Sequence, residues 1–194
     1  VCLVFCFCVV AVLVLLGQSA SDFDLPGIVG ETYSLVDFKD AELLLILFTC
    51  NHCPTAQAYE DRIISLHADF KDRGVAMVAI SPNSAEAVRL DELGYTDLGD
   101  SLDDMKIRAE HRGFEFPYLY DGETQKVSRT YGVRATPHVF IFDKDRKLRF
   151  VGGIDDNDIA PPKNHYTRDA ITDLLADRPV ATPESKVFGC STKW

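Results

Sequence analysis

The chain of 194 residues has 30 acidic and 20 basic side chains, a formal net charge of -10 at pH 7, and 46% hydrophobic residues. All of its charged residues follow residue 21. This acidic balance argues against a surface for nucleic acid or anionic membranes, which attract basic patches. Residues 22–179 are numerous enough for one domain with its own hydrophobic core.

Residues 1–16 are apolar, and small or polar residues follow at 17–21. This pattern is typical of the apolar part and the cleavage zone of a secretory signal peptide. An apolar run of this length falls short of the roughly 20 residues that cross a bilayer. We therefore predict a signal peptide at 1–21, here without its basic start, that is removed from a secreted or periplasmic protein. If the segment is retained, the protein is expected to be membrane-anchored.

The rest of the chain predicts alternating strands and helices. Apolar runs at 43–48 and 75–80 are typical of buried strands, and glycines at positions 74, 113 and 132 mark helix ends. The expected order is a hairpin at 23–38, a strand at 43–48, a helix at 54–73, strands at 75–80 and 117–120 around a helix at 101–113, a helix at 124–131, strands at 138–142 and 148–151, and a helix at 167–176. This order predicts an α/β fold with a mixed sheet covered on both faces, followed by a tail at 180–194.

Cys50 and Cys53 belong to a Cys-Asn-His-Cys-Pro motif between the first buried strand and the helix that follows it. A closely spaced cysteine pair in this position is typical of a redox dithiol. An exposed cysteine at a helix start is expected to be a thiolate, because unpaired amides and the helix dipole favour negative charge. The sequence therefore predicts Cys50 as the nucleophile and Cys53 as its partner.

Four motifs carry a resemblance to a known family. They are Cys-Asn-His-Cys-Pro at 50–54, Phe-Pro-Tyr-Leu-Tyr-Asp at 116–121, Thr-Pro before a Phe-rich strand at 136–142, and Gly-Cys-x-x-Lys-Trp at 189–194. With them the chain resembles the thioredoxin-like superfamily in its redoxin branch, which also holds alkyl hydroperoxide reductase and thiol-specific antioxidant proteins. The resemblance implies a three-layer fold with a redoxin-type insertion. It also implies thiol–disulfide exchange with thiol or disulfide proteins, without an organic cofactor or a metal.

The resemblance also assigns roles to individual residues. Pro137 is expected to be cis and to face the dithiol, and Thr136 and Pro137 are expected to present backbone groups to the partner chain. His52 lies where protein disulfide isomerases also have a histidine, and its positive charge is expected to stabilise the Cys50 thiolate. Leu44 stands where thioredoxins bury an aspartate. Either Glu60, His52 or a water is therefore expected to handle the proton of the second cysteine, or disulfide exchange is expected to be slower at low pH.

Relatives often carry a cysteine at position 135 and an aspartate at position 138, where this chain has Ala135 and His138. The first difference removes a possible third redox thiol near the dithiol. Cys190, in the tail, is left with three possible roles: a free thiol, a partner in an intermolecular disulfide, or a resolving cysteine if the tail folds back.

Three other functions stay open. A peroxiredoxin-like peroxidase would use Cys53 before Pro54 and an arginine such as Arg134, but Cys50 stands where peroxiredoxins have a threonine. A copper-handling protein would need a distant ligand such as His111 or His138, because Cys50, His52 and Cys53 are too close together to all face one ion. A non-catalytic binding module would not need an intact dithiol.

Overall fold

The computed structural model describes residues 14–96 and 98–194. Its centre is a five-stranded sheet in the order β5-β4-β3-β7-β8. Strands β3 (Leu43–Phe48), β4 (Val75–Ser81) and β5 (Tyr118–Tyr120) are parallel, whereas β7 (His138–Phe142) and β8 (Leu148–Gly152) are antiparallel to their neighbours. The expected mixed α/β sheet is confirmed.

Strand β3 forms the middle of the sheet because all six of its side chains are apolar and are buried on one face or the other. Leu43, Leu45 and Leu47 belong to the core on one side, and Leu44, Ile46 and Phe48 belong to the core on the other side. Alternation of this kind follows from the two-residue period of a strand. A strand buried on both faces needs helices or other cover on both sides, as the apolar run predicted.

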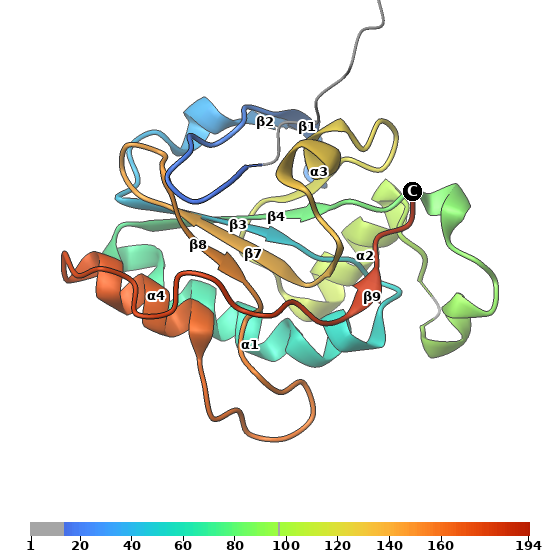
Figure 1. The fold of residues 1–194 in the computed structure, drawn as a ribbon. Coiled ribbons are helices and arrows are strands. Elements are labelled where there is room, and N and C mark those ends of the chain that lie inside the picture. Colours follow the sequence, from blue (N-terminus) through green and yellow to red (C-terminus); the bar gives the residue numbers. More distant parts are fainter. Residues whose placement is uncertain (1–13, 97) are drawn as a thin grey trace, which may run out of the picture.

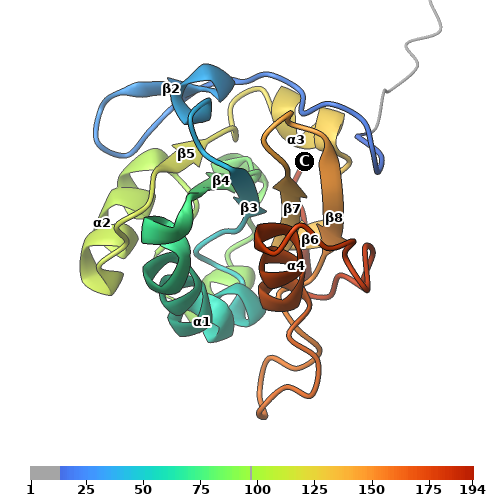
Figure 2. The ribbon, with the colours of Figure 1, turned by 90° about the vertical axis from the view of Figure 1, so that its left-hand side faces the viewer.

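The cover forms two further layers (Figures 1 and 2). Helices α1 (Pro54–Phe70), α2 (Leu102–Arg112) and α4 (Tyr166–Leu175) supply side chains to one core. Helix α3 (Lys126–Tyr131) and the hairpin of β1 (Asp24–Pro26) and β2 (Thr32–Ser34) cover the other face. The three-layer architecture is confirmed. The segment between β4 and β5, which contains α2, is the expected insertion.

The predicted signal peptide is described only in part, since residues 1–13 lie outside the described residues. Residues 14–21 run beside the edge strand β8, where the Gly17 amide donates to the Leu148 carbonyl at 2.8 Å and the Leu148 amide donates to the Gln18 carbonyl at 2.9 Å. Val14 is buried in the core beneath α3. Among the described residues no helix is long and apolar enough to cross a membrane.

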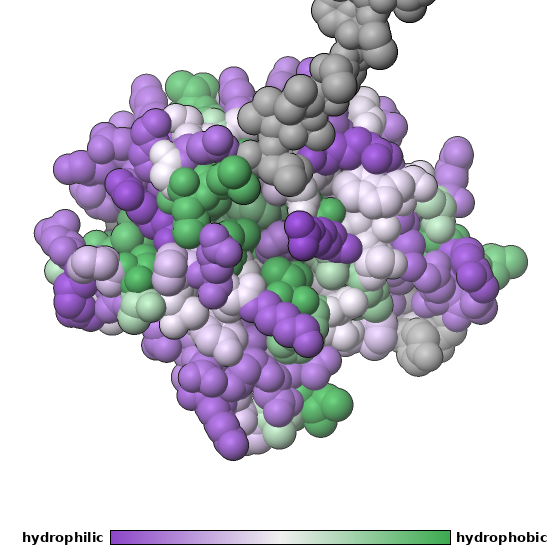
Figure 3. Space-filling model, in the orientation of Figure 1, coloured by the Kyte–Doolittle hydropathy of each residue, from purple (hydrophilic) through white to green (hydrophobic). Residues whose placement is uncertain are grey.

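Residues 180–194 follow α4 and cross the molecule to the opposite end of the sheet, as the red chain in Figure 1 shows. They end in β9 (Cys190–Ser191), which pairs with the short strand β6 (Ala135–Thr136). The face that the tail crosses is mainly hydrophilic, with apolar residues in separate patches (Figure 3). The tail is joined to the domain by backbone hydrogen bonds at Pro183 and Ser185, which meet Val151, and at Thr192, which meets Arg134.

Candidate functional site

Cys50 and Cys53 lie at the end of β3, where the chain turns into α1, and both are reduced in this structure. The expectation that Cys50 is exposed at the helix start is wrong. Cys50 is 3% exposed and Cys53 is fully buried. Cys53 is the N-cap residue of α1, and its sulfur accepts a hydrogen bond from the Ala56 amide at 3.4 Å. A free amide at the start of α1 therefore contacts the sulfur of the second cysteine, Cys53, and not that of Cys50.

Asp100 explains why the helix begins after Cys53. One oxygen of its carboxylate accepts the amides of Asn51 and His52 at 2.8 and 3.1 Å. These amides are held by a side chain of the insertion, and the residues between the cysteines form a bend instead of a first helical turn. Pro54 then occupies the first helical position, where its missing N–H costs nothing.

The surroundings of the two thiols act on their pKa values in opposite directions. A hydrogen bond from the Cys50 thiol, helped by the Ala56 amide and by Cys190, lowers the pKa of Cys53 to about 5. Burial raises the pKa of Cys50 well above its usual value, and the charges of Asp100 and Cys53 raise it further. These directions favour a Cys53 thiolate in this reduced, closed state, and the role of Cys50 as the attacking sulfur stays a prediction. The hydroxyl of Thr136 lies 3.0 Å from the Cys50 sulfur and acts in the opposite direction on its pKa.

His52 forms a buried pair with Asp100, with 2.6 Å between Nδ1 and Oδ2. Burial lowers the pKa of His52, but the hydrogen bond and the charge of Asp100 outweigh it and raise the pKa above its usual value. Burial likewise opposes the charge of Asp100, but the bonds from His52 and Asn83 hold its pKa below the usual value. The positive charge of His52 is thus paired with Asp100 and is not free for the Cys50 sulfur.

Asp100 is the site residue that sequence reasoning missed. The proton-handling role was assigned to Glu60, His52 or a water, but the buried carboxylate of Glu60 accepts from Nε and Nη2 of Arg108 on α2, both at 2.7 Å. Asp100 lies 48 residues from His52 in the sequence. The sequence shows only that it precedes Ser101, the residue that caps α2. That position marks a helix start and does not point to the dithiol.

The peptide bond between Thr136 and Pro137 is cis, as the resemblance implied. It lies directly beside the dithiol, because Thr136 contributes its hydroxyl to Cys50 and its carbonyl lies 3.6 Å from the Cys53 sulfur. Four of the predicted site residues, Cys50, Cys53, Thr136 and Pro137, are thus brought together. Their catalytic roles remain predictions.

Cys190 joins this cluster from the tail. Its amide donates to the Cys53 sulfur at 3.3 Å, and its side chain packs against Cys50, Cys53 and Ala56. Burial and the neighbouring Cys53 raise the pKa of Cys190 to about 12, so it is a thiol. Of the three possible roles for Cys190, a tail that folds back onto the dithiol agrees with its position.

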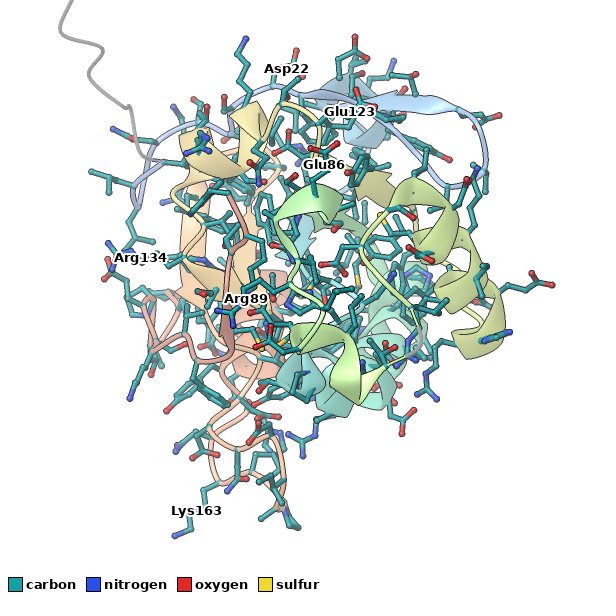
Figure 4. The ribbon with its side chains drawn as sticks, turned by 90° about the vertical axis from the view of Figure 1, so that its right-hand side faces the viewer. Asp22, Glu86, Arg89, Glu123, Arg134 and Lys163 are labelled. Carbon is teal, nitrogen blue, oxygen red and sulfur yellow. The ribbon has the colours of Figure 1, made fainter. Side chains whose placement is uncertain are left out.

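The residues of the alternative functions are placed differently. Arg134 is exposed and points outward at the edge of the molecule (Figure 4). His111 is exposed on α2, and His138 is buried with a pKa lowered to about 4, mainly by burial.

A second set of metal-ligating side chains, different from the expected one, lies close together. The ligand atoms of Cys50, His52 and Asp100 are within 4.8 Å of one another. Both oxygens of Asp100 are already occupied by four donors, including the Asn83 amide at 2.7 Å. The Asp100 carboxylate is therefore satisfied by hydrogen bonds and fits an ion poorly, although Nε2 of His52 has no partner among the described residues.

The sheet order, the cis proline and the adjacent cysteine pair define a protein of thioredoxin-like fold with a dithiol site. The AhpC/TSA family matches residues 16–151 of the chain, and the chain belongs to this family. The expected redoxin membership is confirmed.

Three relatives illustrate the similarity. An uncharacterized conserved protein from Geobacillus kaustophilus has a structure with a TM-score of 0.83 at 37% identity, covering 94% of this chain and 93% of that chain. A hypothetical protein from Sinorhizobium meliloti 1021 has a TM-score of 0.80 at 32% identity, covering 93% and 94%. The thiol-disulfide oxidoreductase ResA of Bacillus thuringiensis is 26% identical over 135 residues, which are 69% of this chain and 66% of ResA.

Proposed function

We propose that this protein is a thiol–disulfide oxidoreductase that exchanges disulfides with partner proteins through Cys50 and Cys53. The observation that carries the proposal is the reduced Cys50–Cys53 pair beside the cis Thr136–Pro137 bond, with the Cys53 sulfur accepting the Ala56 amide of α1 at 3.4 Å. A thiolate is the reactive species in disulfide exchange. The similarity to ResA supports the same chemistry.

In the proposed reaction Cys50 attacks a disulfide sulfur of the partner. The proton between the two cysteines moves to Cys53, and the Thr136 hydroxyl at 3.0 Å donates to the sulfur of Cys50 as it becomes charged. A mixed disulfide forms, and one partner thiolate leaves. Cys53 then passes its proton to the first partner thiolate and attacks Cys50, which forms the Cys50–Cys53 disulfide and releases the second partner thiolate. That thiolate takes its proton from water. The partner gains two electrons and two protons, and the reverse sequence oxidises a partner dithiol.

Trapping tests the order of attack. Both variants are made in the Cys190→Ser background, because the Cys190 thiol packs against the dithiol. Cys53→Ser should then accumulate a mixed disulfide that peptide mapping places on Cys50, because no neighbouring thiol is left to resolve it. Cys50→Ser should accumulate no mixed disulfide with a protein substrate, because Cys53 is fully buried. Equal trapping by both variants, or a mixed disulfide only on Cys53, would reject Cys50 as the attacking sulfur and retain the low-pKa Cys53 in that role.

A peroxidase is the second candidate, and the Cys53 thiolate before Pro54 is the observation that favours it. Against it, Cys50 stands in the place of the threonine that orients peroxide, and Arg134 points away from the site. We expect the reduced protein to reduce insulin disulfides with dithiothreitol much faster than it consumes hydrogen peroxide. Rapid peroxide consumption that survives Cys50→Ser and is lost in Cys53→Ser would make the protein a peroxidase.

We also propose that the protein works outside the cytoplasm, as a secreted or periplasmic protein. The apolar residues 1–16 and the small residues that follow them support export. Residues 14–21 contact β8, so cleavage near residue 20 would remove this edge contact. Cell fractionation with N-terminal sequencing of the exported protein tests the proposal. Recovery from the cytoplasm alone would reject it, and recovery from membranes with residue 14 intact would indicate an anchor.

A further inference from the structure

Residues 189–194 occupy the backbone edge at Thr136, where the family resemblance places the partner chain. Strand β9 pairs antiparallel with β6, with Cys190 opposite Thr136 and Ser191 opposite Ala135. The Thr192 amide continues the ladder to the Arg134 carbonyl at 3.2 Å. The tail therefore lies where an extended partner segment would add to the strand beside the cis proline.

Gly189 is what allows this close approach. A Cβ atom at this position would lie 1.9 Å from the Thr136 carbonyl oxygen, which is backbone and cannot give way. The φ angle of Gly189 is also +148°, a conformation that other residues rarely adopt. A glycine directly before Cys190 thus permits the cysteine to reach the dithiol.

The end of the tail is fixed beyond Cys190. The Lys193 amide donates to Asn83 Oδ1 at 2.9 Å, and the Lys193 carbonyl accepts the Ser84 amide at 3.0 Å. The guanidinium carbon of Arg129 lies 4.3 Å from the ring centre of Trp194. Contacts on both sides of Cys190 therefore hold it against the dithiol, where its amide donates to the Cys53 sulfur at 3.3 Å and its side chain packs against the cluster of Cys50, Cys53 and Ala56.

We propose that Cys190 is a third redox thiol, which forms a disulfide with Cys53 while residues 189–194 occupy the edge of β6. The proposal rests on the dithiol chemistry proposed above. After a partner has been reduced, Cys190 attacks Cys53 in the Cys50–Cys53 disulfide. The Cys53–Cys190 bond forms, the Cys50–Cys53 bond breaks, and the proton of Cys190 passes to Cys50. No electron enters or leaves in this step, and Cys50 becomes a free thiol again.

Mass spectrometry of the Cys50→Ser variant tests the new bond. Glutathione disulfide supplies the oxidising equivalents. Cys53 attacks it, forms a glutathione adduct and releases glutathione. We expect Cys190 to displace the second glutathione, so that the variant ends as an intramolecular Cys53–Cys190 disulfide without an adduct. The matched control, Cys50→Ser with Cys190→Ser, should stop at the adduct. An adduct on Cys53 with free Cys190 in the first variant would overturn the proposal.

A second test addresses the close approach of the tail. In the Cys50→Ser background, Gly189→Ala should slow closure of the Cys53–Cys190 disulfide and let the adduct accumulate. Gly30→Ala is the matched control, since Gly30 also has a positive φ, +87°, but its Cβ would meet no atom within 4 Å. Equal closure rates in these two variants would contradict the role of the strand pairing.

The wild-type protein keeps the proposal testable if a variant does not fold. After mild oxidation and alkylation of free thiols, peptide mapping should find the Cys53–Cys190 disulfide beside Cys50–Cys53. A map with Cys50–Cys53 alone would overturn the role of Cys190 and leave the proposed function intact. If the cysteines of the wild-type protein react with no added disulfide, the proposed function itself is rejected.

Discussion

Replacement of Asp100 by asparagine should destabilise the protein strongly. The carboxylate is fully buried and accepts four hydrogen bonds, from two amides, the His52 ring and the Asn83 side chain. An asparagine would turn an NH₂ group toward two of these donors and leave His52 without its charge partner. Removal of one member of a buried pair costs about 3–5 kcal/mol. We expect the free energy of unfolding to fall by about 3 kcal/mol, at the lower end of this range, because His52 can lose its proton and so avoid an unpaired buried charge.

The pH dependence of this loss has a defined sign. The raised pKa of His52 stabilises the wild type fully below the usual value of 6.5, and this contribution disappears as the pH rises through the folded-state pKa. The lowered pKa of Asp100 contributes above its usual value of 3.8 and is lost as the pH falls below it. The difference between wild type and Asp100→Asn should therefore be largest between these values.

Urea denaturation over this pH range measures the difference in the free energy of unfolding. Asp103→Asn is the matched control, because this nearby carboxylate is 88% exposed and its ion pair is at the surface. Its effect should stay within about 0.5 kcal/mol. A loss below about 1 kcal/mol in Asp100→Asn, or an unchanged His52 pKa by nuclear magnetic resonance, would refute the buried pair as described.

Three further outcomes are expected. Glu60→Gln should lower the free energy of unfolding by about 1–3 kcal/mol, since it weakens the buried contact with Arg108, and should leave the thiolate titration unchanged; a shifted titration would bring Glu60 back to the dithiol. Ile63→Ala should cost about 2–5 kcal/mol in urea denaturation, because the side chain is 2% exposed in the α1 core, and a smaller loss would mean that the core collapses around the cavity. Cys50→Ala should move the ultraviolet thiolate titration of Cys53 upward from about pH 5, because it removes the largest cause of the low pKa, whereas an unmoved midpoint would leave the helix end as the cause.

Most of the fold could be predicted because its causes are local. The run Leu43–Phe48 has no polar side chain and so had to be buried on both faces, and Pro54 and Gly74 bracket the first helix by their backbone properties. The dithiol and the cis proline followed from motifs. The environment of the two thiols did not, because it depends on the burial of Cys50 and on contacts to Cys53 from Cys190, which lies 137 residues further along the chain.

The position of the tail was also beyond local reasoning. Residues 180–194 have no hydrophobic period, and their pairing with β6 is made by backbone groups that any sequence offers. The one residue-specific requirement is Gly189, whose need appears only once the Thr136 carbonyl is placed beside it. A glycine next to a cysteine is compatible with many loops, so the contact could be recognised only in three dimensions.

The planar side-chain amide of Asn83 connects the tail to Asp100. Its oxygen accepts from the Lys193 backbone at 2.9 Å, and its nitrogen donates to Asp100 at 2.7 Å. The oxygen and nitrogen are rigidly joined, so rotation of the amide to follow one partner withdraws it from the other. Lifting the tail frees the oxygen and removes the constraint that aims the nitrogen at the His52–Asp100 pair. The Asn83 side chain thus links the position of residues 189–194 to the hydrogen bond that Asp100 receives beside His52.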